Sequence, residues 1–127
     1  MTYNELEEKL NELNIEDFIW VIYIFIIFMS WYSNSKERHY FIYNDEQSKN
    51  EYRCLVILIF TKLLIVYLYF VKSAWDSYKK LKTSDSPKVR ELATLSLIAS
   101  LLIAISGSIF LYIAIVDTNL TIEVAFN

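Results

Sequence analysis

Three long apolar runs alternate with polar segments along the chain. The first covers residues 18–32 without a charge, and the second covers residues 54–71, where only Thr61 and Lys62 interrupt it. The third, residues 92–116, holds no charged residue at all. A helix needs about 20 consecutive apolar residues to cross the hydrocarbon core of a bilayer. The pattern therefore predicts three transmembrane helices, at about residues 15–33, 53–72 and 92–116.

The polar segment after the second run, residues 72–82, has no helix breaker, so we expect the second helix to continue to about Lys82. Ser86 and Pro87 are then predicted to form the N-cap and the first turn of the third helix. At 1.5 Å per residue, helices over residues 50–82 and 87–116 would be about 50 Å and about 45 Å long. Both lengths exceed a hydrocarbon core of about 30 Å. The fold class is thus an all-α membrane protein whose second and third helices form a long antiparallel hairpin that extends beyond the bilayer.

The two ends of the chain are predicted to form structures separate from the three spans. Residues 1–14 predict a short amphipathic helix, with a capping box from Thr2 to Glu5 and apolar residues at three-four-three spacing. Its other faces are mostly acidic, so we expect it to pack against protein, for example the basic end of the hairpin in its own or a neighbouring chain. Residues 117–127 alternate apolar and polar positions like a short strand, with residues 39–43 as the nearest possible partner. The three-span domain between these ends covers residues 15–116.

Composition narrows the possible functions. The chain has one Gly, one Pro and one Cys among 127 residues, and its net charge is -3. One cysteine, Cys54, excludes an internal disulfide, and a single histidine, His39, leaves too few ligands for a structural zinc site. The negative charge argues against nucleic-acid binding. Phosphate-loop, metalloprotease and nucleophile-elbow motifs are missing, so we expect neither an enzyme nor a cofactor. Cys54 is expected to be an apolar filler and His39 to be solvated.

The placement of Lys and Arg predicts the orientation in the membrane. Seven positive residues lie before the first span or between the second and third spans, and four lie between the first and second. This asymmetry favours a cytoplasmic N-terminus and an external C-terminus. Five of the seven form a cluster, the basic tip, that is expected to contact anionic lipid, or to bind an anionic ligand or a regulatory protein: Lys79, Lys80, Lys82, Lys88 and Arg90.

Lys62 lies near the middle of the second span, nine residues after Arg53 and ten before Lys72. A lysine at that depth costs about 2.5–3.5 kcal/mol on insertion scales. One interpretation is that Lys62, with Thr61, faces a water-filled path or an intramembrane partner and attracts anions or gates conduction. The other is that the second span is shifted in register, or that the ammonium is satisfied by Tyr hydroxyls and backbone carbonyls.

Small residues gather on one face of the third span. Such rows let helices approach closely in a membrane, so we expect this face to pack against another helix. The residues concerned are Ala93, Ser96, Ser100, Ala104, Gly107, Ser108 and Ala114. A second hypothesis is that Ser96 and Ser100 line a narrow polar path once several chains assemble.

A three-span chain of this size has too little surface to enclose a transport path alone, so we expect self-association or attachment to a larger partner. The abundance of Ile, Lys, Asn and Tyr is typical of an AT-rich bacterial genome, which favours the bacterial inner (cytoplasmic) membrane. In size, span count and charged flanks the chain is similar to the small multi-span effectors of bacterial antiphage systems. That resemblance implies a homo-oligomeric pore, or another membrane-permeabilising effector, that a signal or partner releases. The alternatives are a non-conducting accessory or immunity-type protein that binds a larger membrane partner, and a holin.

Overall fold

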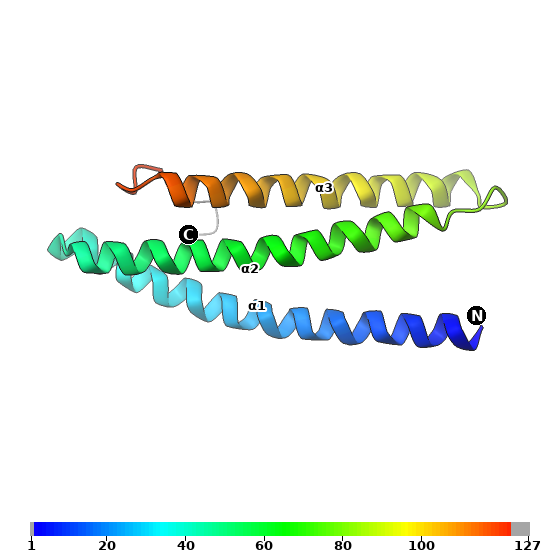
Figure 1. Ribbon diagram of the computed structural model, residues 1–127, viewed down its shortest axis with the longest axis horizontal. Helices are drawn as coiled ribbons and strands as arrows, with labels where there is room; N and C mark the ends of the chain where they lie inside the picture. The colour runs from blue at the N-terminus through cyan, green and yellow to red at the C-terminus, as the bar shows by residue number, and fades with distance from the viewer. Residues whose placement is uncertain (1, 123–127) are drawn as a thin grey trace.

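The computed structural model describes residues 2–122, and in this part of the chain it contains three helices joined by short turns (Figure 1). They are α1 (Tyr3–Tyr43), α2 (Glu46–Lys79) and α3 (Pro87–Val116). Each helix is long and apolar enough to cross a membrane. The prediction of an all-helical chain with three helices of this kind is confirmed.

Helix α1 is a single element of 41 residues, about 60 Å long at the usual rise. It includes both the expected short N-terminal helix and the polar segment after the first apolar run. No Gly or Pro occurs within it to break the backbone hydrogen bonding. The predicted capping box is present: the Glu5 backbone N–H donates to Thr2 Oγ1 and the Thr2 N–H donates to Glu5 Oε2, both at 3.2 Å.

The turn between α1 and α2 makes the second helix begin earlier in the chain than predicted. Asn44 adopts a left-handed conformation with φ of 52°, which an asparagine tolerates better than most residues and which ends α1. Asp45 then caps α2 by accepting a hydrogen bond from the Gln47 N–H. As a result α2 begins at Glu46 rather than at residue 50. At its other end α2 stops at Lys79 rather than Lys82, with Lys80 as the C-cap. Residues 39–43 are helical, so they are not a strand partner for the tail.

Helix α3 begins as its sequence predicts. Ser86 Oγ accepts a hydrogen bond from the Val89 N–H at 3.3 Å, and Pro87 occupies the first turn. After α3 the Asp117 carboxylate accepts hydrogen bonds from the backbone N–H groups of Thr121 and Ile122. This turn occupies the first part of the segment predicted to be a strand. The remainder, residues 123–127, lies outside the described residues.

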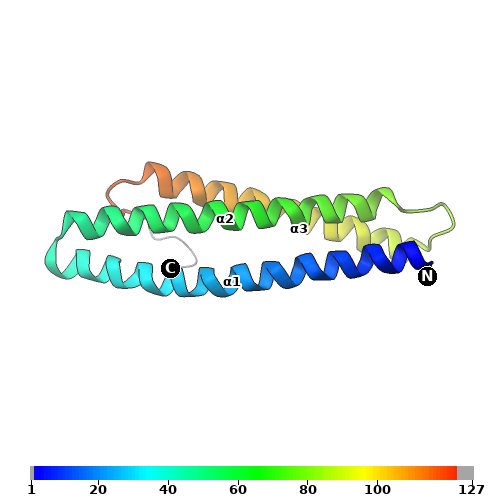
Figure 2. The same cartoon turned by 60° about the horizontal axis from the view of Figure 1, so that its bottom comes forward.

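Helix α2 lies between the other two helices and runs antiparallel to both, so α1 and α3 point the same way (Figures 1 and 2). Among residues 2–122, no Cα of α1 comes within 8 Å of a Cα of α3. Their side chains nevertheless reach a common core on α2, where Ile59 is completely buried, Ile26 enters from α1 and Ala114 from α3. The arrangement is an open layer with α1 at one edge and α3 at the other.

Candidate functional site

The Lys62 side chain lies half-buried on the part of α2 that packs against α1. Its Nζ atom is 3.7 Å from Met29 Sδ, a weak hydrogen-bond acceptor. Within the described part of the chain, no carboxylate forms an ion pair with Lys62. The hydroxyls and carbonyls that the second interpretation invoked make no hydrogen bond with Nζ among these residues. The positive charge is thus held beside a thioether without an anion to balance it.

Thr61, the neighbour of Lys62, is exposed on a stripe of α2 that neither α1 nor α3 covers. Its hydroxyl donates to the Ile57 carbonyl at 2.7 Å, which satisfies the donor within the helix. The stripe repeats at four-three spacing, and we call it the outer face of α2. Its members are Cys54, Leu58, Thr61, Ile65, Leu68, Lys72 and Trp75. Thr61 therefore lies on this uncovered and mainly apolar surface, and Lys62 lies beside it on the side of α1.

The small residues of α3 are directed mainly at α2. Ala104, Gly107 and Ala114 are buried, Ala93 and Ser100 are half-buried, and Ser96 and Ser108 are exposed. The Ser100 hydroxyl donates to the Ser96 carbonyl at 2.8 Å, and the Ser108 hydroxyl donates to the Ala104 carbonyl at 2.9 Å. The hydroxyl donors of Ser100 and Ser108 are therefore satisfied within α3. Most of the small-residue face is occupied by contact with α2 of the same chain.

The basic tip lies beside the acidic start of α1. Lys80 Nζ is 2.9 Å from Glu8 Oε1, and this hydrogen-bonded contact raises the pKa of Lys80. Other cations of the tip have local partners: Lys79 pairs with Asp76, Lys88 with Glu91, and Arg90 donates to the Lys82 carbonyl. All five cations are exposed, so each pair contributes little to stability. The contact nevertheless ties the N-terminal end of α1 to the end of α2.

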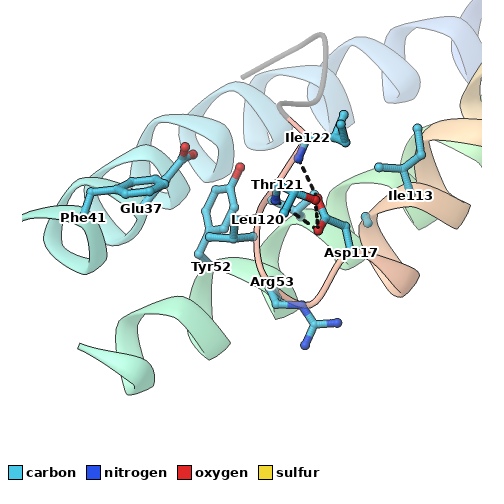
Figure 3. Close-up of a pocket in the computed structure, with 11 residues that line it drawn as sticks. Glu37, Phe41, Tyr52, Arg53, Ile113, Asp117, Leu120, Thr121 and Ile122 are labelled. Atoms are coloured by element: carbon cyan, nitrogen blue, oxygen red, sulfur yellow. Dashed lines mark hydrogen bonds between the residues drawn. The ribbon is translucent and has the colours of Figure 1, made fainter. Parts of the chain in front are cut away.

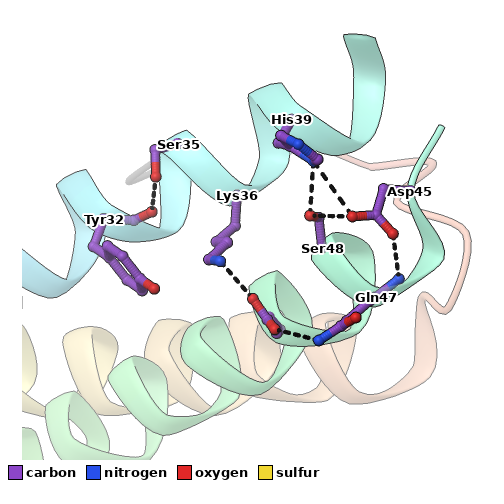
Figure 4. A network of polar contacts seen from close by, with 8 residues as sticks. Tyr32, Ser35, Lys36, His39, Asp45, Gln47 and Ser48 are labelled. Carbon is purple, nitrogen blue, oxygen red and sulfur yellow. Dashed lines mark hydrogen bonds and ion pairs between the residues drawn. The ribbon is translucent and has the colours of Figure 1, made fainter. Parts of the chain in front are cut away.

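A polar cluster at the opposite end was not anticipated from the sequence, and it includes His39, which is exposed as expected (Figure 4). The Ser48 hydroxyl lies 2.9 Å from His39 Nδ1 and 2.9 Å from Asp45 Oδ2, and Asp45 Oδ2 is 3.5 Å from the same ring nitrogen. Serine and aspartate share one nitrogen, whereas a catalytic triad needs them on opposite nitrogens. The cluster therefore ties the start of α2 to the end of α1. No sequence motif identifies it, because only the turn at Asn44 brings these positions together.

The same cluster contains an ion pair between Lys36 and Glu51, whose Nζ and Oε2 atoms are 2.7 Å apart. The hydrogen bond from Lys36 lowers the pKa of Glu51, and the same contact raises the pKa of Lys36. The pKa of Asp45 is also lowered, mainly because Ser48 donates a hydrogen bond to it. These charges fasten α1 to α2 where the chain turns.

A cavity of about 330 Å³ lies at this end between α1, α2 and the turn after α3 (Figure 3). Its polar lining includes Glu37, Arg53 and Asp117. Arg53 Nη2 donates to the Ile115 carbonyl at 3.0 Å and so satisfies part of the C-terminal end of α3. Backbone hydrogen bonds from Ile122 and Thr121 lower the pKa of Asp117. The Asp117 carboxylate serves to hold the turn, which makes this pocket a structural junction.

Comparison with protein-family models, with curated proteins and with solved structures gives no match to this chain. Among the described residues, no group of three or more His, Cys, Asp or Glu side chains is placed to hold a metal ion.

Proposed function

We propose that the chain inserts into a bilayer with all three helices, assembles with further copies of itself, and makes the membrane permeable to ions. The observation that carries this proposal is the ammonium of Lys62, which sits in mid-span beside the Met29 thioether without an acidic partner in the described chain. The structural features below support it.

Insertion of all three helices is supported by the surface and by the position of the ion pairs. Large side chains of α1 such as Trp20, Phe25 and Trp31 are more than 60% exposed, a surface suited to lipid rather than water. The Lys36–Glu51 and Glu8–Lys80 pairs lie at opposite ends of the contact between α1 and α2. The apolar segments 18–32 and 54–71 lie between these pairs and would share one membrane slab.

The proposed conduction path runs along the outer face of α2, with Lys62 at the border of that face toward α1. An uncompensated lysine in hydrocarbon costs about 2.5–3.5 kcal/mol on insertion scales, and access to water or an anion relieves that cost. Thr61 and Lys62 would form a polar ring between apolar side chains such as Leu58 and Ile65. Apolar constrictions of this kind gate by excluding water, and a ring of lysines favours anions. We therefore expect an anion-preferring pore with an apolar gate.

The proposed orientation places the N-terminus and the basic tip in the cytoplasm and the C-terminus outside, with the bacterial inner membrane as the site. The contact between Glu8 and Lys80 then lies on the cytoplasmic side, where an anionic ligand or regulatory protein would compete for the tip. A control region of this kind suits an effector of antiphage defence. The free helix edges also fit a non-conducting accessory protein, so conduction is the property to test.

Purified protein in liposomes provides the test, with chloride and potassium leakage as the readout and native mass spectrometry giving the number of copies. The wild type should leak and form a defined homo-oligomer. Lys62→Leu should lose the preference for chloride, whereas the control Lys88→Leu, which removes an exposed lysine on α3 and off the outer face of α2, should keep it. An oligomer that does not leak would favour the accessory alternative. An unchanged chloride preference in Lys62→Leu would contradict the proposed path.

A further inference from the structure

We propose that, within the assembly, the N-terminal part of α1 in one copy packs against the first turns of α3 in the next copy. The inference rests on the self-association proposed above and goes further by identifying the two surfaces that meet. Those surfaces are an apolar stripe on α1 (Leu6, Leu10 and Leu13) and an apolar stripe on α3 (Val89, Leu92 and Leu95).

Neither stripe is covered within the single chain. All six side chains are between 41% and 54% exposed within the single chain. They lie beside charged segments, next to the Glu8–Lys80 contact on α1 and the Lys88–Glu91 pair on α3. Leu6, Leu10, Leu13 and Val89 lie outside the proposed spans, where lipid tails no longer cover apolar surface, and Leu92 and Leu95 begin the third span. Packing against another protein surface would bury these side chains.

The two stripes lie at the same height along the layer. Leu10 is two residues from Glu8, which contacts Lys80 near the end of α2. A second reference point is Gly107 of α3, which lies against Tyr67 of α2. Helices α1 and α3 both run antiparallel to α2, so residues can be counted along α2 from one contact to the other. This count places Leu10 of α1 level with the second and third turns of α3. Because α1 and α3 start at the same end of the layer (Figure 2), copies that share one membrane orientation would have the two stripes at the same end.

The charges at the two edges select this pairing over a symmetric one. Residues 1–17 carry six acidic side chains and one lysine, whereas the α3 edge begins beside the basic tip. Packing α1 against α1 of a second copy would bring the acidic segments together, and like charges oppose each other across an interface. Packing α1 against α3 brings acidic and basic segments together. An interface between two different surfaces also generates rings when the rotation closes, as a pore requires.

The pairing is unavailable within one chain in the observed arrangement. Helix α2 separates the two edges, and no Cα of α1 comes within 8 Å of a Cα of α3 among residues 2–122. A disulfide needs Cα atoms about 4.4–6.8 Å apart. Cross-linking between α1 and α3 therefore distinguishes a contact between copies from one within a copy.

The experiment uses full-length protein in nanodiscs, with Cys54→Ser as the background so that no native thiol interferes. One population carries Leu10→Cys with one affinity tag, and a second carries Leu95→Cys with another tag. After mixing in detergent, reconstitution and mild oxidation, we expect a disulfide-linked pair carrying both tags. The matched control replaces Leu95→Cys by Tyr112→Cys, which is exposed but about 25 Å further along α3 at the usual rise. That pair should stay unlinked.

Three outcomes overturn the inference: no cross-link, equal cross-linking in the control, or a link that forms only when both cysteines are in one chain. Native mass and leakage of the Cys54→Ser background are measured in parallel. A leaking oligomer without the Leu10–Leu95 link would contradict this interface alone. A monomeric background protein would contradict both the interface and the proposed pore.

Discussion

The ring of Tyr67 on α2 occupies the space that a side chain at position 107 of α3 would need. A Cβ atom built on Gly107 would lie 2.9 Å from Tyr67 Cδ2, closer than real Cβ contacts allow. The one glycine of the chain thus lies where α3 packs directly against the Tyr67 ring of α2. Close approach at a small residue is a main source of helix association in a bilayer, where water does not drive apolar surfaces together.

Substitution Gly107→Leu should therefore weaken the packing of α3 on α2. Overpacking of this kind costs roughly 1–3 kcal/mol, because Tyr67 must leave its position. Thermal unfolding in detergent, followed by circular dichroism, should show a lower midpoint. Ser106→Leu, at the exposed neighbouring position, is the matched control and should unfold close to the wild type. Equal midpoints for the two variants would contradict the role assigned to Gly107.

Removing the mid-span charge should make the second helix easier to insert. Lys62→Leu should favour insertion by about 2.5–3.5 kcal/mol, the cost of a lysine at the centre of a membrane helix. A glycosylation-based insertion assay on residues 46–79, which reports the inserted fraction of a segment, measures this directly. The same change at Lys72, near the end of the helix, should have a smaller effect. Equal effects would place Lys62 away from the bilayer centre.

The polar cluster at the α1–α2 turn should make stability depend on pH in the acidic range. The pKa of Asp45 is lowered in the folded chain, chiefly by the Ser48 hydrogen bond. A lowered carboxyl pKa means that the stabilisation is present above the ordinary value of 3.8 and is lost as the pH falls below it. Asp45→Asn should therefore unfold at a lower temperature than the wild type at pH 7. That difference should shrink at pH 3, and a constant difference would contradict the assignment.

The contact between Glu8 and Lys80 should control how firmly the start of α1 is held. Glu8→Lys should separate the two ends, as measured by the distance between spin labels on α1 and on the end of α2. The reversed pair, Glu8→Lys with Lys80→Glu, should restore the wild-type distance. Because both side chains are exposed, high salt should reduce the effect. A distance that does not change in Glu8→Lys would show that other contacts hold the helix.

The sequence by itself determined the three helices, the start of α1 and both ends of α3. Apolar runs, the Thr2–Glu5 capping box and the Ser86–Pro87 start act through neighbours in the chain, so their effects can be read locally. The sequence also has no Gly or Pro between residues 3 and 43, which allows one continuous helix well beyond the predicted span of residues 15–33. A polar stretch continues a helix unless something ends it, which is why α1 extends through both charged flanks.

Only the tertiary structure decided which surfaces are covered. The spacing of small residues along the third span predicts that they share one face. It does not show that α2 of the same chain covers that face. Likewise, mid-span Lys62 is evident in the sequence, whereas the Met29 sulfur beside it depends on the register between α1 and α2. The His39–Ser48 contact depends in turn on the left-handed Asn44. Register and helix crossing arise from side-chain packing between distant segments, and a periodic pattern within one segment does not contain them.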